Sequence, residues 1–233
     1  MSDGDTKVQR MGSGQGFWTL LTQDERDTLS VLGLRRDYSP GAIICHEGDP
    51  AMHVFILLTG WVKILATTAD GHDLVLALRG DGETVGEIAG ETTGRRSATM
   101  QAIDAVRALM VRYDEFRHFL DTNVGAGHAY RRVVTQRWRD TDTTVRGRTG
   151  TSGAQRLARL LIDLADRRGQ AVDGAIYLDL PLTQDELASL AGTSRATVTR
   201  ALSNWRKRRF VLTTQRHITI IDLGALRRVA GQT

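Results

Sequence analysis

Short apolar runs separated by turn residues fill the chain from residue 39 to residue 111. The runs lie at 43–45, 54–58, 61–65, 74–78, 98–102 and 105–111. Glycine, aspartate and proline stand between them, and these residues tolerate positive φ or favour turns. Short strands with regular turns are typical of antiparallel sheets. We therefore expect a β-roll, or jelly roll, over residues 17–121, which begins with a helix capped by Thr22 and Glu25 in a capping box and reaching Leu32.

A helical period replaces the strand pattern over residues 122–148. Side chains recur there at steps of three and four along one stripe, at Tyr130, Val134, Arg137/Trp138, Thr141 and Val145. The stripe contains arginine and threonine, and arginines flank it, so it is a poor candidate for the core of a monomer. We interpret this segment as a dimerisation helix; a helix lying on its own β-roll is the alternative.

The last third of the chain has the pattern of a second domain, residues 154–233, after a hinge-like stretch at 149–153. Leucines share one helix face as far as Arg168, and Thr183 and Glu186 form another capping box. Gly192 then permits a sharp turn before a helix that Ser194 caps and that ends near Lys207. This spacing predicts a helix-turn-helix, followed by a β-hairpin wing with its tip at 213–217. The fold class is α+β.

The charge distribution points to a polyanion partner for this second domain. The 233 residues carry a net charge of +4, yet residues 1–150 hold 18 basic and 20 acidic side chains, whereas residues 151–233 hold 13 basic and 7 acidic. Arginine forks suit guanine edges in the major groove, and hydroxyls and helix N-termini hold phosphates. The predicted DNA-facing residues are Thr183, Ser194, Arg195, Ala196, Thr197, Thr199 and Arg200, with Arg216 in the wing.

Composition excludes several other classes. Cys45 is the single cysteine, so no intramolecular disulfide or four-cysteine iron–sulfur cluster can form, and a reducing cytoplasmic location is expected. Residues 1–16 form a polar, glycine-rich tail, and no run of about 18 apolar residues predicts a membrane span. No P-loop, metal-ligand cluster or nucleophile motif is present, so we expect no enzyme, no catalytic residue and no metal.

A candidate ligand cassette interrupts the strands of the β-roll. It consists of Gly86, Glu87, Ile88 and Ala89, joined by Arg96 and Ser97. A turn with free N–H groups, one guanidinium and one carboxylate can bind a cyclic phosphate together with a sugar hydroxyl. A surface ion pair between Glu87 and Arg96 is the alternative.

These motifs resemble the cyclic-AMP receptor protein / fumarate-nitrate regulator (CRP/FNR) family. The likeness covers about residues 20–225 in the order β-roll, long helix, winged helix-turn-helix. It implies a homodimer that binds a pseudo-palindromic operator in double-stranded DNA under the control of cyclic AMP, with RNA polymerase as a further partner. In a dimer of this kind the two recognition helices enter major grooves one helical turn, about 34 Å, apart.

Residue by residue, the resemblance assigns the phosphate to Arg96 and Ser97 and the ribose hydroxyl to Glu87, with Gly86 permitting close approach. Thr141 matches the hydroxyl that the family presents to the purine, and Asp142 stands where its best-known member has serine. Arg195 and Arg200 match base-contacting arginines. Ala196 replaces a common glutamate between them, so we expect a different operator at that base pair.

Two alternatives within the family remain open. Some members sense haem, for which Cys45, His46, His53 and His72 are the candidate ligands. A lone cysteine on an apolar strand is usually part of a core, which weighs against haem. Other members bind DNA without any nucleotide, in which case Glu87 and Arg96 have structural roles only.

Overall fold

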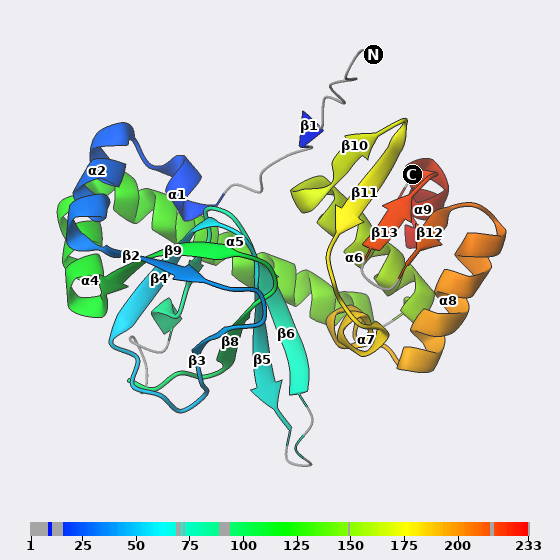
Figure 1. Cartoon of the computed structure of the whole chain (residues 1–233), viewed down its shortest axis with the longest axis horizontal. Coiled ribbons are helices and arrows are strands. Elements are labelled where there is room, and N and C mark those ends of the chain that lie inside the picture. The colour runs from blue at the N-terminus through cyan, green and yellow to red at the C-terminus, as the bar shows by residue number, and fades with distance from the viewer. Residues whose placement is uncertain are drawn as a thin grey trace, which may run out of the picture. The chain divides into compact units, whose positions relative to one another are not determined.

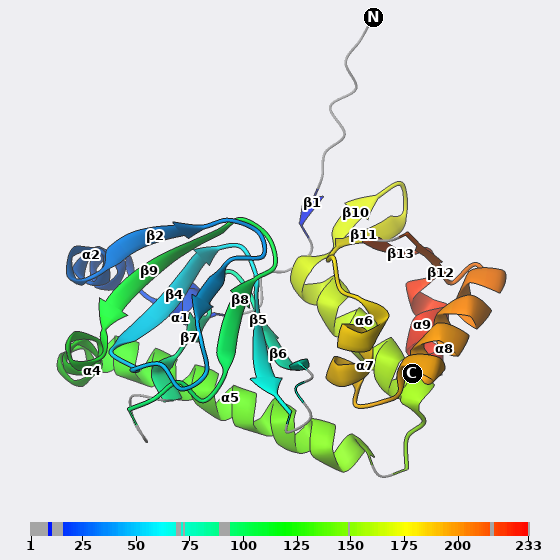
Figure 2. The same ribbon diagram turned by 60° about the horizontal axis from the view of Figure 1, so that its bottom comes forward.

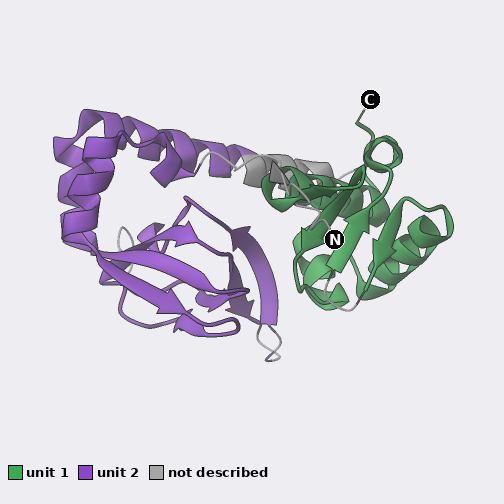
Figure 3. Cartoon of the chain, turned by 45° about the horizontal axis from the view of Figure 1, so that its top comes forward, with its two compact units in different colours: residues 1–14, 144–233 green, residues 15–143 purple. Residues whose placement is uncertain are grey.

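The computed structural model describes residues 9–10, 16–68, 71, 73–88, 94–148, 150–214 and 217–232, with side chains everywhere in these ranges except 9–10 and 140–148 (Figure 1). The chain divides into two compact units (Figure 3). One consists of residues 15–143 and the other of residues 144–233 together with residues 1–14. The boundary therefore lies inside helix α5 (Val124–Arg148), before the stretch 149–153 in which the sequence suggests a hinge.

Two four-stranded antiparallel sheets form the β-roll in the unit of residues 15–143, as the sequence predicts. One sheet has the order β2-β9-β4-β7 and the other β3-β8-β5-β6. Their strands are β2 (Leu34–Tyr38), β3 (Ile43–Cys45), β4 (His53–Thr59), β5 (Val62–Thr67), β6 (Asp73–Arg79), β7 (Thr84–Val85), β8 (Thr99–Ala102) and β9 (Val106–Arg112). Strand β2 is not among the apolar runs that the sequence offers as strands, because its residues, Leu-Arg-Arg-Asp-Tyr, are mostly exposed at the sheet edge and lack an apolar alternation.

Strand β4 is buried on both faces, which explains its unbroken apolar run. Phe55 and Leu57 belong to the core inside the roll. Val54 and Ile56 point the other way, into a second core beneath the helices of this unit. Those helices are α1 (Phe17–Leu20), α2 (Gln23–Leu32), α4 (Tyr113–Thr122) and the first part of α5, and α5 runs along one side of the roll (Figure 2).

Three aromatic rings join α1, α4 and α5 in that second core. Phe17, Phe116 and Tyr130 meet edge to face with centroid separations of 5.6–5.9 Å. Such pairs contribute about 0.5–1.5 kcal/mol each beyond their buried area. The sequence places Tyr130 on a dimer seam, but Tyr130 packs within its own unit. The first half of α5 therefore lies on its own β-roll unit, which is the alternative to the seam.

The unit that contains residues 144–233 is a winged helix-turn-helix, as predicted. Its helices are α6 (Gly153–Arg168), α7 (Gln184–Ala191), α8 (Arg195–Lys207) and α9 (Leu223–Ala230). Its sheet has the order β1-β10-β11-β13-β12, formed by β1 (Gln9–Arg10), β10 (Gln170–Val172), β11 (Ala175–Asp179), β12 (Val211–Thr213) and β13 (His217–Ile220). Two residues of the expected tail, Gln9–Arg10, thus pair with β10 as a strand.

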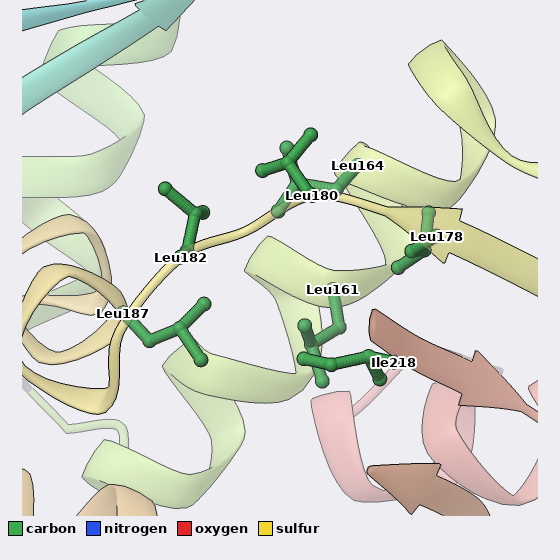
Figure 4. Close-up of a pocket in the computed structure, with 7 residues that line it drawn as sticks. All are labelled: Leu161, Leu164, Leu178, Leu180, Leu182, Leu187 and Ile218. Atoms are coloured by element: carbon green, nitrogen blue, oxygen red, sulfur yellow. The ribbon is translucent and has the colours of Figure 1, made fainter. Parts of the chain in front are cut away.

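Leucines from several elements of this unit meet around a small pocket that marks its core (Figure 4). The lining side chains come from α6, α7, β11, β13 and the connection after β11, and they are Leu161, Leu164, Leu178, Leu180, Leu182, Leu187 and Ile218. The leucine stripe of α6 therefore anchors the helix-turn-helix to the sheet. No helix in the described part of the chain is both long and apolar enough to cross a membrane.

Candidate functional site

The cassette begins where strand β7 ends, at Gly86. This residue has φ of +85°, a conformation that glycine adopts without steric cost. A Cβ atom at position 86 would clash with Nη1 of Arg96. Two features therefore favour glycine at position 86: the left-handed backbone conformation and the close approach of the Arg96 guanidinium.

Arg96 is a buried cation, with 4% of its surface exposed. Its Nη1 donates to the carbonyl of Gly86 at 2.9 Å and its Nη2 donates to the carbonyl of His53 at 2.7 Å. Its guanidinium carbon lies 5.4 Å from the ring centroid of Phe55. Its Nε is buried without a hydrogen-bond partner, and none of the ion pairs within the described residues gives Arg96 a carboxylate. A buried charge without a counter-ion is costly, so this site favours an anion.

Glu87 is equally buried, at 4% exposed, and points its carboxylate at helix α5. Its Oε1 accepts a 2.6 Å hydrogen bond from Nη1 of Arg137. The same guanidinium donates from Nη2 to the carbonyl of Thr84 at 2.9 Å and lies 3.5 Å from Oε1 of Glu83. Oε2 of Glu87 is buried and has no partner among the described residues. One oxygen of Glu87 thus anchors α5, and the other is left for a donor.

Arg137 joins the candidate site through Glu87, a contact that the sequence does not indicate. The helical stripe places it at a dimer seam, yet its side chain enters the β-roll unit and joins Glu87. Tyr130 and Arg137 of the stripe both contact their own β-roll unit, whereas a dimer seam along the rest of the stripe stays a prediction. An arginine between the apolar residues of the stripe is the available signal, since a buried arginine needs an anion.

The other residues predicted in the β-roll are distributed differently. Ser97 and Ile88 are exposed, and Ser97 makes no side-chain hydrogen bond within the described chain. Ala89 lies outside the described residues, and so do the side chains of Thr141 and Asp142, whose backbones belong to α5. The cassette therefore unites Gly86, Glu87 and Arg96, while the purine-facing positions stay predictions.

Of the four proposed haem ligands, His72 lies outside the described residues, and within those residues no cluster of three or more His, Cys, Asp or Glu side chains occurs. Cys45 is half-buried at the end of β3 and packs against the core of the roll. Burial raises the pKa of its thiol, and the nearby Arg96 only partly opposes this. A thiol is a metal ligand as its thiolate, so this environment disfavours ligation.

The helix-turn-helix forms as its sequence pattern predicts. Thr183 caps α7 in a complete capping box with Glu186. Gly192 ends α7 in the left-handed conformation, with φ of 58°, which makes the tight turn. Ser194 then caps α8, its Oγ accepting from the backbone N–H of Thr197 at 3.2 Å. Thr183 and Ser194 therefore have helix-capping roles in addition to the phosphate contacts expected of them, and Thr197 supplies the N–H that Ser194 caps.

Arg156 and Gly153 of α6 hold this turn in place. Arg156 donates to the carbonyls of Ala191 at 3.0 Å and Gly192 at 2.8 Å, which otherwise end α7 unsatisfied. A Cβ on Gly153 would clash with Oγ1 of Thr193. Gly153 is thus the first residue of α6 and a packing position, and a hinge over 149–153 stays a prediction. Thr149, where the proposed hinge begins, lies outside the described residues.

Helix α8 separates its buried and exposed faces clearly. Val198, Ala201, Leu202 and Trp205 are buried. Arg195, Ala196, Thr199 and Arg200 are exposed, as the predicted DNA-facing surface requires. Arg216 of the predicted wing lies outside the described residues, although β12 and β13 flank it as a hairpin.

Two of these exposed residues contact the first turn of α7. Nη1 of Arg195 lies 3.4 Å from Oδ2 of Asp185, and both side chains are about two-thirds exposed, at 69% and 65%. Oγ1 of Thr199 donates to Oε1 of Gln184 at 2.5 Å. The guanidinium of Arg200 makes no hydrogen bond or ion pair with the described part of the chain. Sequence reasoning missed Gln184 and Asp185, because both fit an ordinary helix first turn.

Comparison with known proteins matches both units. A cyclic nucleotide-binding domain family matches residues 35–123, and a Crp-like helix-turn-helix domain family matches residues 155–229. A CRP-like cAMP-activated global transcriptional regulator of Mycobacterium tuberculosis is 30% identical over 194 residues, which cover 83% of this chain and 87% of that protein. The cyclic AMP receptor protein of Thermus thermophilus is 29% identical over 182 residues, covering 78% and 81%.

Solved structures share the fold over nearly the whole length. A CooA mutant from Carboxydothermus hydrogenoformans gives a TM-score of 0.73 at 21% identity, covering 95% of this chain and 98% of that one. At this level of identity the likeness establishes the arrangement of the elements and carries no information about the ligand.

Proposed function

Because the chain belongs to the CRP/FNR family of DNA-binding transcription regulators, we propose that a cyclic nucleotide, with cyclic AMP as the first candidate, binds its β-roll and modulates operator binding by a homodimer. The observation that carries the proposal is Arg96, a buried cation with no carboxylate partner among the described residues and with an unused N–H. A cyclic phosphate supplies the missing negative charge.

Glu87 supports the same ligand. Its Oε2 is a buried acceptor without a donor in the described chain, and it belongs to the same short segment as the Gly86 carbonyl that Arg96 contacts. A ribose hydroxyl is a donor that can satisfy it. Arg96 and Glu87 together fit one negative group and one hydroxyl, and Ser97, Thr141 and Asp142 are the further contacts that we propose.

Helix α5 is the proposed route from ligand to DNA. A ligand hydroxyl that donates to Oε2 of Glu87 would bind the same carboxylate that Arg137 binds through Oε1. Ligand binding would therefore change the strength of the contact that anchors α5. The ligand then shifts an equilibrium between postures of the DNA-binding unit, and linkage requires that operator DNA strengthens ligand binding by the same factor.

The homodimer is proposed from the exposed side of α5. Trp138 is 74% exposed, and exposed apolar residues of this size mark interaction sites in soluble proteins. A dimer would place two α8 helices in major grooves about 34 Å apart on a pseudo-palindromic operator. Sedimentation of Trp138→Glu against the wild type tests this seam, because a seam through Trp138 predicts that the variant is a monomer.

Contact with RNA polymerase and a cytoplasmic location stay predictions.

Calorimetric titration with cyclic AMP and with cyclic GMP tests the ligand. We expect micromolar or tighter binding by the wild type, loss of binding in Arg96→Ala, and retention in Arg95→Ala. Arg95 is the matched control, since it is the neighbouring arginine but is exposed and donates to the carbonyl of Gly48. Circular dichroism confirms that each variant is folded.

A wild type that binds neither nucleotide but does bind a DNA operator would favour the alternative, a family member that acts without a cyclic nucleotide. Absorbance near the haem Soret band on reconstitution would then test the haem hypothesis.

A further inference from the structure

We propose that the first turn of α7 is part of the operator-reading surface, with Asp185 positioning Arg195 and Gln184 reading a base beside Thr199. The inference rests on the proposed DNA-binding function and adds two residues that neither the family match nor the helix pattern assigns. It concerns the winged helix-turn-helix alone and is independent of the ligand in the β-roll.

Asp185 restricts Arg195 before DNA arrives. An arginine side chain has five N–H donors in a planar fork, and a guanine edge uses two of them. The carboxylate of Asp185 lies 3.4 Å from Nη1 of Arg195, so it orients the fork and leaves the other donors for a base. Arg200, whose guanidinium has no partner in the described chain, must lose more rotamer freedom when it binds.

The placement of Asp185 is unfavourable for DNA affinity alone. An acidic side chain on a surface that meets phosphates weakens binding to every duplex. A favourable interaction with the N-terminus of α7 gives it a local role, but Glu186 already supplies a carboxylate to that turn. Helix α8 has no carboxylate of its own, since Ala196 stands beside Arg195 on its exposed face. Among the described ion pairs, the carboxylate that pairs with Arg195 is that of Asp185 on α7.

Gln184 extends the surface in a second direction. The single proton of the Thr199 hydroxyl has two acceptors within reach, Oε1 of Gln184 on α7 and, at 3.0 Å, the carbonyl of Arg195 on its own helix, so the hydroxyl is held between α7 and α8. When that proton goes to Oε1, the two donors on Nε2 of Gln184 remain for an acceptor. Guanine N7 and O6, adenine N7 and thymine O4 are the major-groove acceptors that suit an amide donor.

The experiment uses the full chain and a duplex selected from a random library by the wild type. Dissociation constants are measured for that duplex, for each single-base substitution and for an unrelated duplex, at several salt concentrations. The variants are Asp185→Asn, Gln184→Ala and Arg195→Ala. Asp163→Asn is the matched control, because Asp163 is 58% exposed and pairs with Arg167 at 3.5 Å within α6.

For Asp185→Asn we expect preference at the base pair read by Arg195 to fall by roughly tenfold, which is within the range of one bidentate contact. Affinity for the unrelated duplex should rise, since one negative charge is lost. Asp163→Asn should leave the preference unchanged, and Asp185→Asn should cost no further preference when Arg195 is already alanine. If Asp185→Asn strengthens all duplexes by one factor with preference intact, Asp185 has no positioning role.

For Gln184→Ala we expect lost preference at a different base pair, with an unchanged salt slope. A uniform loss across all duplexes would show a phosphate contact and overturn base reading by Gln184. A wild type that selects no duplex at all would instead contradict the proposed DNA-binding function, so the two failures are distinguishable.

Discussion

Arg137 of α5 donates a 2.6 Å hydrogen bond to Glu87 of the cassette, and the two residues are 50 positions apart in the chain. The pair joins the proposed ligand site to the helix that leads toward the DNA-binding unit. Its side chains are 17% and 5% exposed, so water screens the interaction weakly.

Replacing Arg137 with methionine should destabilise the β-roll unit by about 3–5 kcal/mol, because Glu87 would stay buried as an uncompensated carboxylate. Urea denaturation followed by tryptophan fluorescence measures the change. Arg107→Met is the control, since Arg107 forms a 3.0 Å pair with Asp37 at the surface. That variant should cost about 1 kcal/mol at most. Equal losses in the two variants would show that the Arg137 pair is not a buried anchor.

Gly86→Ala should lose both stability and nucleotide binding. The new Cβ meets Nη1 of Arg96 and displaces the guanidinium from its two carbonyls. Gly41→Ala is the matched control, because Gly41 has nearly the same φ of +82° but open space where the Cβ would lie. Both variants carry the cost of a left-handed backbone conformation, about 1–2 kcal/mol. The difference between them in thermal denaturation and in calorimetric titration therefore measures the clash with Arg96. A Gly86 variant that binds nucleotide as the Gly41 variant does would count against the cassette.

Gly153→Ala should destabilise the helix-turn-helix and weaken operator binding. Its Cβ would press on Thr193 and on Thr197 of α8, and overpacking of this kind costs about 1–3 kcal/mol. Gly224→Ala, in the first turn of α9, has 3.4 Å of space to the nearest atom and should be neutral or stabilising by up to about 1 kcal/mol. Denaturation curves and operator titrations of the two variants measure the difference. Equal stability and equal operator affinity in the two variants would show that residue 153 does not pack closely against the turn.

Cys45 should be alkylated slowly in the native protein. Burial raises the pKa of its thiol, so the reactive thiolate is scarce at pH 7. Mass spectrometry after iodoacetamide treatment should show faster labelling in urea, and the native rate should keep rising at pH values above the ordinary thiol pKa. Labelling as fast in the native as in the unfolded chain would mean that the thiol is exposed.

The local features of the fold were predictable because each depends on neighbouring residues only. The capping boxes of Thr22 and Thr183, the left-handed turn at Gly192 and the cap at Ser194 all close hydrogen bonds within a few residues. Gly86, Glu87 and Arg96 were also identified from sequence, as a motif. Strand β2 was missed because an exposed edge strand carries no apolar alternation.

The sequence alone determined the two units, the apolar strands, the long helix and the helix-turn-helix. It also determined which side chains suit an anion or a DNA groove. Tertiary structure alone decided the partners. Arg137 could belong to a dimer seam or to Glu87, and Arg195 to solvent or to Asp185, because a charged side chain on a helix has the same local pattern in each case. Only the packing of distant segments brings a second charge within a few ångströms, and Coulomb energy depends on that distance and on burial.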